Sequence, residues 1–384
     1  MTIGIDIRVL GNKTKSGIEE YAENLMPHLI KEGNDIKFKL FYSSRRSYLP
    51  EYDWLQAQNV KLYEFNYPNN LLFTSSRFLN KPFLDKMIGG VDVFFFPHFF
   101  LSSLSPSCKR VTTFHDLSYV HFPEHLTLRK KFWHNFQMIP RWQAKFSDKI
   151  IAVSESTKED LINFYKIDPA RIEVIYSGVE LRLNLNHERF NLKEFKRAKN
   201  LPHRFILFLG KLEPRKNIIS IIKAFNSLKL NSKYNDVGLV IAGAKGWLYE
   251  DIFRLRLNLN MKFNLNDRII FTGQIHDEER NLYYRAAEIF VYPSFFEGFG
   301  FPPLEAMSCG TPVITSRNSS LPEVVDASAI TVDPYDVNEL ELWITKLLDD
   351  KKLSELMTKR GIEQSVKFEW HKTAIRTLEV LTKA

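Results

Sequence analysis

The chain has 384 residues, of which 44% are hydrophobic and 26% charged, with a net charge of +8; this is the composition of an ordinary globular protein long enough for two or three domains. Its two cysteines, Cys108 and Cys309, lie far apart and in no metal-ligand spacing, which argues against a disulfide framework or a zinc site and agrees with a reducing cytoplasm. The N-terminus lacks the basic-then-apolar pattern of a signal peptide, and the most apolar run, residues 91–101, is too short to span a bilayer.

Short apolar runs rich in Val, Ile and Phe alternate with helical periodicity along the whole chain, which is typical of parallel α/β sheets. The pattern predicts two doubly wound, Rossmann-like domains over residues 1–185 and 204–366. A polar, charged linker is expected at 186–203, and a final helix over 367–384. The predicted strands are 2–9, 35–42, 59–64, 92–96, 109–114, 149–153 and 171–175 in the first half, and 204–210, 237–243, 267–273, 288–292, 311–315 and 329–332 in the second.

The first helix is signalled by a capping-box spacing between Ser16 and Glu19. The loop Leu10–Gly17 therefore joins the first strand to the first helix, where an open α/β sheet presents its ligand edge. One apolar stripe follows at helical spacing, formed by Ile18, Tyr21, Ala22, Leu25, Met26 and Leu29.

A predicted strand ends at His115 and Asp116. A histidine at the carboxyl edge of a sheet is able to hydrogen-bond a sugar hydroxyl or a phosphate. A lone histidine is more often structural, however, and both interpretations stay open because three more histidines lie close in the sequence: His121, His125 and His134. Asp116 is expected to orient the adjacent backbone or an acceptor.

The positive charge is concentrated in the first half of the chain. Residues 1–200 carry 29 basic against 22 acidic side chains and residues 201–384 carry 24 against 23, so the first half contributes +7 of the +8. Residues 129–133, Arg-Lys-Lys-Phe-Trp, interleave cations with aromatics, and Arg45 and Arg46 add to them. Such a patch suits an anionic membrane surface, although a solvated helix face with a buried Trp fits equally. No nucleic-acid partner is expected, because the sequence has neither a dense basic patch nor a reader motif.

A basic turn follows the first predicted strand of the second half. It runs Gly-Lys-Leu-Glu-Pro-Arg-Lys-Asn, and its cations Lys211, Arg215 and Lys216 are suited to neutralising a diphosphate. Asn217 is a candidate N-cap for a helix beginning near Ile218. A merely solvated basic loop is the alternative.

The most informative segment is residues 296–314, FEGFGFPPLEAMSCGTPVI. Its glycines let the backbone bend and approach a ligand, Pro303 suits the first helical position, and Gly310 suits the helix C-terminus. The helix N-terminus would offer unpaired N–H groups to phosphate, and Glu297 and Glu305 bracket the loop as acceptors for pairs of sugar hydroxyls. A structural strand-to-helix turn with a capping Glu is the alternative.

This segment, together with the Ser-Ser-Leu-Pro-Glu-Val run at 319–324, resembles the Glu–seven–Glu signature of glycosyltransferase family four. The similarity extends in order over nearly the entire chain. It implies GT-B architecture, in which two Rossmann-like domains face each other across a cleft, and a retaining transferase that uses a nucleotide-sugar. It also implies that the last helix, containing Trp370, crosses back to the N-terminal domain.

The resemblance also implies roles for individual residues. Glu297 would contact the donor sugar, Glu305 the nucleotide ribose, and His115 would lie near the transferred sugar. Lys216 matches the family lysine beside the departing diphosphate; Lys211 stands where Arg is usual, so Arg215 is expected to share that role. The other donor-binding positions implied are Gly17, Gly273, Ile275, Gly298, Phe299, Gly300 and Phe301, while acceptor binding is assigned to Asp116.

Catalysis is expected to rest on electrostatic stabilisation of the leaving diphosphate. No pair of acids is placed as in a glycosidase, no Asp-x-Asp metal motif occurs, and no metal or cofactor is expected. GDP-mannose is the expected donor and a UDP-sugar the alternative. The expected acceptor is a saccharide or lipid-linked saccharide at the cytoplasmic face, as in surface polysaccharide assembly; a nucleotide-sugar epimerase and a non-catalytic basic binding protein are further alternatives.

Overall fold

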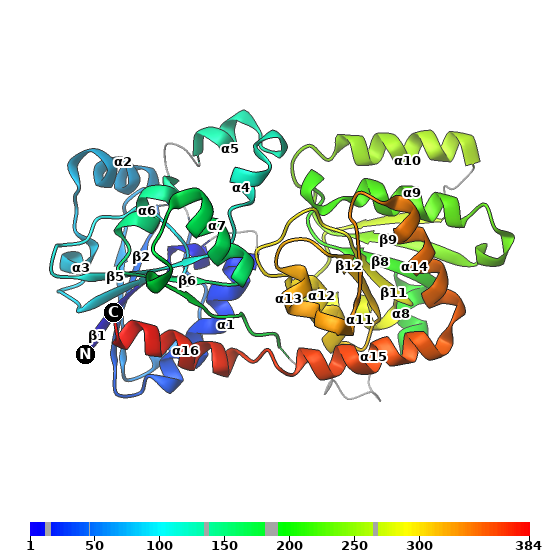
Figure 1. Ribbon diagram of the computed structural model, residues 1–384. Helices are drawn as coiled ribbons and strands as arrows, with labels where there is room; N and C mark the ends of the chain where they lie inside the picture. Colours follow the sequence, from blue (N-terminus) through cyan, green and yellow to red (C-terminus); the bar gives the residue numbers. More distant parts are fainter. Residues whose placement is uncertain (12–16, 46, 134–137, 181–190, 264–267) are drawn as a thin grey trace. The chain divides into compact units, whose positions relative to one another are not determined.

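The computed structural model describes residues 1–11, 17–45, 47–133, 138–180, 191–263 and 268–384. The chain forms two compact units (Figure 1). The first unit combines residues 1–178 with 368–384, and the second comprises residues 179–367.

The first unit contains a seven-stranded parallel sheet in the order β3-β2-β1-β4-β5-β6-β7. Every strand predicted for the first half is present. The strand order reverses between β1 and β4, the switch point at which doubly wound sheets bind their ligands. The strands are β1 (Thr2–Asp6), β2 (Lys37–Ser43), β3 (Val60–Phe65), β4 (Val93–Phe96), β5 (Lys109–Phe114), β6 (Lys149–Ala152) and β7 (Ile172–Val174).

Helices cover this sheet, and the predicted apolar stripe of α1 supplies its buried face. Tyr21, Leu25 and Met26 are fully buried there, whereas the predicted cap Ser16 lies outside the described residues. The helices are α1 (Gly17–Glu32), α2 (Asn69–Leu79), α3 (Leu84–Met87), α4 (Ser118–His121), α5 (Leu128–Phe132), α6 (Pro140–Phe146), α7 (Glu155–Tyr165) and α16 (Trp370–Thr382), with 3-10 turns at Arg8–Gly11, Asp53–Gln56, Pro123–His125 and Pro169–Arg171.

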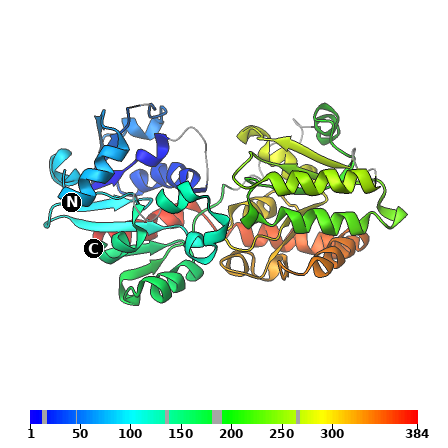
Figure 2. The same ribbon diagram turned by 90° about the horizontal axis from the view of Figure 1, so that it is seen from above.

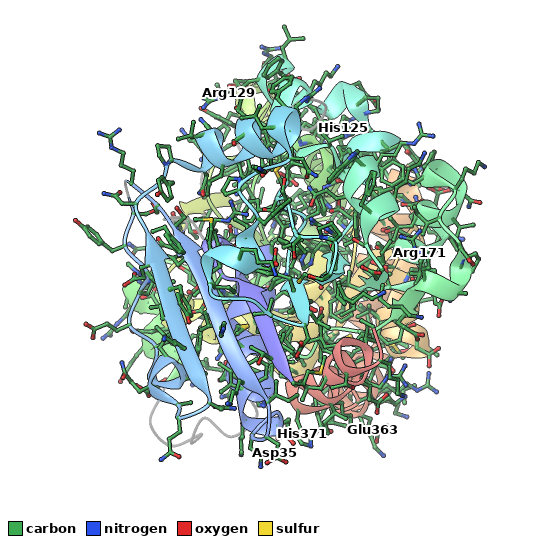
Figure 3. The ribbon with its side chains drawn as sticks, turned by 90° about the vertical axis from the view of Figure 1, so that its left-hand side faces the viewer. Asp35, His125, Arg129, Arg171, Glu363 and His371 are labelled. Atoms are coloured by element: carbon green, nitrogen blue, oxygen red, sulfur yellow. The ribbon has the colours of Figure 1, made fainter. Side chains whose placement is uncertain are left out.

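The C-terminal helix α16 belongs to the first unit, where it packs against α1. The ring centroids of Tyr21 and Trp370 are 5.8 Å apart in an edge-to-face contact. At the other end of α1, His371 Nδ1 lies 3.2 Å from Glu32 Oε1, and Figure 3 labels His371 and Asp35 at the bottom of the view. The last helix therefore completes the core of the first unit.

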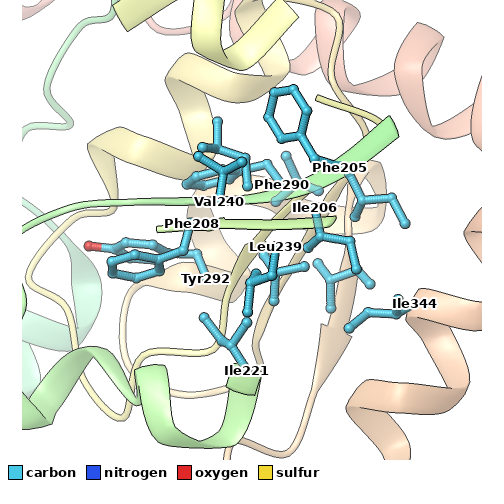
Figure 4. Packing of buried hydrophobic residues seen from close by; sticks show 14 of the residues in the cluster. Phe205, Ile206, Phe208, Ile221, Leu239, Val240, Phe290, Tyr292 and Ile344 are labelled. Carbon is cyan, nitrogen blue, oxygen red and sulfur yellow. The ribbon is translucent and has the colours of Figure 1, made fainter. Parts of the chain in front are cut away.

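The second unit contains a six-stranded parallel sheet in the order β10-β9-β8-β11-β12-β13, with its switch point between β8 and β11. All six strands predicted for the second half are present. Its core packs Phe205 and Phe208 of β8 against Leu239, Phe290 and Tyr292 (Figure 4). The strands are β8 (Arg204–Leu209), β9 (Val237–Ala242), β10 (Ile269–Gly273), β11 (Ile289–Tyr292), β12 (Val313–Ser316) and β13 (Ile330–Val332).

Eight helices are described in this unit, and α9 and α10 run side by side (Figures 1 and 2). They are α8 (Leu192–Ala198), α9 (Ile218–Leu228), α10 (Glu250–Phe263), α11 (Asp277–Ala286), α12 (Phe301–Ser308), α13 (Leu321–Val325), α14 (Val337–Asp349) and α15 (Lys351–Ser365), with 3-10 turns at Pro214–Lys216, Ser232–Tyr234 and Asp326–Ser328.

A linker was expected at residues 186–203. This expectation is wrong for residues 191–203, the part of that range that the structure describes. The second unit already begins at Val179, and α8 is one of its helices. The Asn191 side chain caps α8, and the ring centroid of Phe195 lies 5.1 Å from that of Tyr283. Residues 191–203 therefore fold onto the second domain, while 181–190 lie outside the described residues.

Both cysteines are buried free thiols, and burial raises the pKa of the Cys108 thiol to about 12. Within the described ranges, no helix combines the length and apolarity needed to cross a membrane. The α/β class and the two Rossmann-like domains predicted from the sequence are confirmed.

Candidate functional site

The basic turn and the glycine segment meet at the switch point of the second sheet. Strands β8 and β11 are hydrogen-bonded neighbours, so the residues that follow them emerge at the same carboxyl edge. A backbone hydrogen bond from Phe295 N to Arg215 O, 2.9 Å long, ties the two loops together. Residues 80 positions apart in sequence are thereby brought into contact.

Glu297 is the centre of a buried ion-paired cluster. Its Oε1 accepts from Lys216 Nζ at 2.7 Å, and its Oε2 accepts from Arg215 Nη1 at 2.9 Å. Ser294 Oγ donates to Oε1 at 2.6 Å. The structure thus joins the predicted acid and two of the predicted cations in one group, which we call the Glu297 cluster: Glu213, Arg215, Lys216, Tyr292, Ser294 and Glu297.

Each cation of the cluster has a further partner. Arg215 donates through Nη2 to Glu213 Oε1 at 2.9 Å and through Nη1 to the Phe296 carbonyl at 2.5 Å. Lys216 Nζ also donates to the Tyr292 hydroxyl and lies 4.9 Å from the centroid of that ring. The charges of the two cations and the two carboxylates therefore cancel, and the cluster itself carries no net charge.

The electrostatics of the cluster favour ionised Glu297. Burial alone would raise the pKa of this carboxyl, but the charges of Arg215 and Lys216 outweigh burial and hold the pKa at about 2, below the ordinary 4.5. Burial and the neighbouring Arg215 lower the pKa of Lys216. The pKa of the Tyr292 hydroxyl is raised, chiefly by burial and then by Glu297.

The loop between Glu297 and α12 depends on Gly300. This residue is the N-cap with φ +116°, and a Cβ there would come within 2.8 Å of Leu321 Cδ2. Ser320 Oγ donates to the carbonyls of Glu297 and Phe299 at 2.9 and 2.8 Å, and Ser319 Oγ accepts from Glu297 N at 2.9 Å. Serines following β12 thus hold the glycine loop in place.

Helix α12 begins two residues earlier than predicted. Phe301 is its first residue, so Pro303 occupies the third position rather than the first, and Glu305 is the fifth residue. Pro302 and Pro303 have no N–H group, so the first turn offers fewer donors than the sequence predicted. The backbone donors at this edge are those of residues 298–301. Gly310 follows the helix end with φ +80°, as predicted.

Glu305 lies 3% exposed and forms a second polar group. Its Oε1 accepts from Arg280 Nη1 at 2.8 Å and its Oε2 from the Tyr284 hydroxyl at 2.7 Å. Arg280 also donates to Asp277 Oδ1 at 2.5 Å. Arg280 and Tyr284, spaced one turn apart on α11, fix the orientation of this carboxylate.

The other predicted donor-site residues lie near the carboxyl ends of the strands of this sheet. Lys211 is half-buried just after β8, outside the Glu297 cluster. Gly273 ends β10 with φ +72°, and Gly243 N donates to its carbonyl at 2.8 Å. Ile275 packs partly buried against the core, whereas Gly298, Phe299 and Gly300 are buried and Phe301 is half-buried.

The predicted residues of the first unit are held by the loops that follow β4 and β5. His115 Nε2 lies 2.7 Å from the Pro97 carbonyl, which only accepts, so Nε2 carries the proton and Nδ1 is an acceptor. Burial lowers the pKa of His115, which keeps the ring neutral.

Asp116 Oδ1 accepts from Ser118 N at 3.1 Å and Ser118 Oγ at 2.8 Å, so this carboxylate orients the adjacent backbone. Gly17 is the exposed first residue of α1.

Several site residues were not predicted. Glu213 lies in the loop after β8, Tyr292 ends β11 and Ser294 follows it, and only the sheet order brings these residues together. Arg280 and Tyr284 carry a weak signal, since a pair spaced by four residues shares one helix face. Among the described residues, no group of three or more His, Cys, Asp or Glu is arranged to hold a metal ion.

Comparisons with known proteins match both halves of the chain to glycosyltransferase models. A model of glycosyl transferases group 1 matches residues 190–364, and a model of glycosyltransferase family 4 matches residues 15–183. The chain is 31% identical over 271 residues to the O-antigen chain mannosyltransferase B of Escherichia coli, covering 70% of this chain and 69% of that protein.

A second relative and one solved structure extend this comparison. The chain is 32% identical over 238 residues to the serotype-specific mannosyltransferase WbdA of Escherichia coli; the match covers 62% of this chain but only 29% of WbdA. The structure of Alr3699/HepE from Anabaena in complex with UDP and glucose matches with a TM-score of 0.73 and 17% identity over 100% of both chains. This likeness concerns the fold, which is of the two-domain GT-B type.

Proposed function

Because the chain belongs to the family 4 glycosyltransferases of group 1, we propose that it transfers mannose from GDP-mannose to a saccharide or lipid-linked saccharide acceptor with retention of configuration. The mannose donor is supported by the mannosyltransferase relatives. The observation that carries the proposal is the Glu297 cluster, in which a carboxylate and two cations meet at the switch point of the second sheet.

In this proposal the cations stabilise the departing diphosphate. Arg215 and Lys216 donate hydrogen bonds to the diphosphate oxygens. Because Glu213 and Glu297 balance the charges of these two cations, the net positive charge comes from Lys211 and from the N-terminal end of α12. An electrostatic site of this kind is fixed before the reaction and needs little reorganisation. We therefore extend the proposal to transfer without a metal ion, to be checked by activity in excess chelator.

Glu297 has a second role in the proposal. With a pKa of about 2 it is a carboxylate at neutral pH, and its oxygens accept hydrogen bonds. It receives donor-sugar hydroxyls while keeping Lys216 and Arg215 in position. The acceptor hydroxyl then attacks the anomeric carbon on the face from which the diphosphate leaves, the new glycosidic bond forms as the bond to the diphosphate oxygen breaks, and the hydroxyl proton passes to that oxygen.

The nucleoside is assigned to the edge formed by β10 and α11. Glu305, oriented by Arg280 and Tyr284, is suited to accept from the ribose hydroxyls. The backbone at Gly273 and Ile275 would contact the base, and the backbone of residues 298–301 the diphosphate and sugar. Gly17 and His115 complete the donor contacts from the first domain, where the neutral His115 offers Nδ1 as an acceptor.

The acceptor is assigned to the first domain, and the reaction to the cytoplasmic face of the membrane. The O-antigen chain mannosyltransferase relative supports a polysaccharide acceptor. In this proposal Asp116 contributes to acceptor binding by orienting the backbone of Ser118. Its Oδ1 already accepts hydrogen bonds from Ser118 N and Oγ.

A UDP-sugar donor is the second candidate, favoured by the fold neighbour from Anabaena bound to UDP and glucose. Thermal-shift measurements with GDP, UDP and ADP separate the two, since the largest stabilisation identifies the donor base. Transfer from the matching nucleotide-sugar to a mannan or lipid-linked acceptor is then assayed. Stabilisation by none of the nucleotides would contradict the proposal. Preferential stabilisation by UDP would contradict GDP-mannose as the donor and identify a UDP-sugar in its place.

A further inference from the structure

Three helices of the first unit share an unusual surface composition. α2, α5 and α6 together contain six cations and neither Asp nor Glu. These cations are Arg77, Arg129, Lys130, Lys131, Arg141 and Lys145. The cluster of positive charge noted in the sequence at residues 129–133 is therefore part of a wider basic region.

The same helices expose large apolar side chains. Phe78 and Leu79 are 73% and 70% exposed, and Leu128 is 84% exposed. Leu71, Phe132 and Phe146 are also more than half exposed. Exposed apolar groups interleaved with cations differ from an ordinary solvated face, on which charges of both signs alternate.

The three helices lie on one side of the first unit. Figure 1 draws α2 and α5 in the upper part of this unit and α6 just below α2, and Figure 3 labels Arg129 of α5 at the top of the same unit. A cavity of about 280 Å³ joins α2 to α6. Its lining combines an indole, two aliphatic side chains, a guanidinium, an amide and a hydroxyl, with no carboxylate: Trp142, Leu101, Ile139, Arg77, Asn80 and Ser76.

Trp142 is the aromatic wall of this cavity. Its ring centroid lies 4.4 Å from that of the exposed Phe146. Trp133, in contrast, packs partly buried against the core of the first unit, so of the two tryptophans it is Trp142 that faces the cavity. Amphipathic rings beside long basic side chains suit the boundary between lipid headgroups and acyl chains.

We propose that α2, α5 and α6, termed the basic–apolar face, dock on an anionic lipid bilayer, and that the cavity beside Trp142 receives a lipid phosphate headgroup. We choose a bilayer as the binding partner because of charge complementarity: the three helices contain six cations and no acidic residue, which matches a negative surface. A protein partner fits less well, because the core of an interface between proteins is depleted of charged residues. The inference does not depend on the proposed transfer, because vesicle binding is measured without donor or acceptor.

The test is flotation of the full chain with vesicles of phosphatidylcholine alone or mixed with phosphatidylglycerol. We expect binding to the mixed vesicles at low salt, reduced at high salt, and little binding to phosphatidylcholine alone. Equal binding to both vesicle types, or none to the mixed vesicles, would overturn the proposal.

Two variants locate the binding to the face. Arg77→Glu with Lys145→Glu should lower the partition coefficient at least twentyfold, since each cation near an anionic surface contributes about fivefold. Phe78→Ser with Leu79→Ser should lower it about tenfold through lost apolar insertion. Unchanged vesicle binding by either folded variant would contradict the proposal.

Matched controls come from exposed cations and an exposed aromatic elsewhere in the first unit. Lys31→Glu with Lys37→Glu, and separately Phe164→Ser, should bind as wild type does. Thermal melting confirms that every variant is folded. Tighter binding to an RNA or DNA oligonucleotide than to vesicles, lost with Arg77→Glu but kept with Phe78→Ser, would assign the face to nucleic acid and overturn the bilayer proposal.

Discussion

Replacement of Lys216 by Ala tests the role of the Glu297 cluster. The change removes a buried cation whose Nζ lies 2.7 Å from Glu297 Oε1. If Lys216 stabilises the departing diphosphate, turnover should fall about a hundredfold, which corresponds to about 3 kcal/mol for one electrostatic donor.

The structure also predicts how stable this variant is. Glu297 retains Arg215 at 2.9 Å and Ser294 at 2.6 Å, so the carboxylate is not left unpaired. The loss in free energy of unfolding should therefore stay at about 1–3 kcal/mol, measurable by urea denaturation. A folded variant with a large loss of activity is the expected combination.

The assay is steady-state transfer from the nucleotide-sugar whose nucleotide gives the largest thermal shift. The matched control is Lys229→Ala. Lys229 is a partly buried lysine of the second unit, and its Nζ donates to the Tyr234 carbonyl at 2.5 Å. Lys229→Ala should leave turnover unchanged. Wild-type turnover in a folded Lys216→Ala variant would show that Lys216 does not stabilise the departing diphosphate.

Three further predictions concern the same domain. Arg280→Ala should weaken nucleoside diphosphate binding about tenfold, because Glu305 loses a charge-assisted hydrogen bond worth about 1.5 kcal/mol. Calorimetry measures this binding, and an unchanged Kd would contradict the prediction. Gly300→Ala should lower the free energy of unfolding by about 1–3 kcal/mol, because it combines φ +116° with a Cβ 2.8 Å from Leu321, and an equally stable variant would disprove the strain. The pKa of Glu297 is about 2 in the folded protein against an ordinary 4.5, so its ionisation contributes stability that is present above pH 4.5 and is lost as the pH falls toward 2. Urea midpoints across that range should fall less steeply for Glu297→Gln, and identical slopes would argue against the low pKa.

The strands were predictable because each is a short run of buried apolar residues bounded by polar turns. Val-Phe-Phe-Phe of β4 and Ile-Phe-Val-Tyr of β11 are buried throughout, as central parallel strands require. Helix α8 was missed because only Leu192 and Phe195 of its seven residues pack against the core. So few apolar positions give no readable periodicity.

The candidate site was predictable in its parts but not in its connections. Glu297, Arg215 and Lys216 stood out by residue type and spacing, yet their mutual contacts depend on β8 lying next to β11. Local sequence does not encode that order. The start of α12 was misplaced because Pro is tolerated at any position of the first turn, so Pro303 did not fix the first residue.

The central claim is that the loops after β8 and β11 hold the diphosphate of a nucleotide-sugar. The most direct measurement is the ratio of the dissociation constants of GMP and GDP, repeated with UMP and UDP, for the wild type and for Lys216→Ala. We expect the wild type to bind the diphosphate of its nucleotide at least about tenfold more tightly than the monophosphate, and we expect this preference to disappear largely in Lys216→Ala. Equal preference in both proteins, or no preference in the wild type, would show that these loops do not hold the diphosphate in this way.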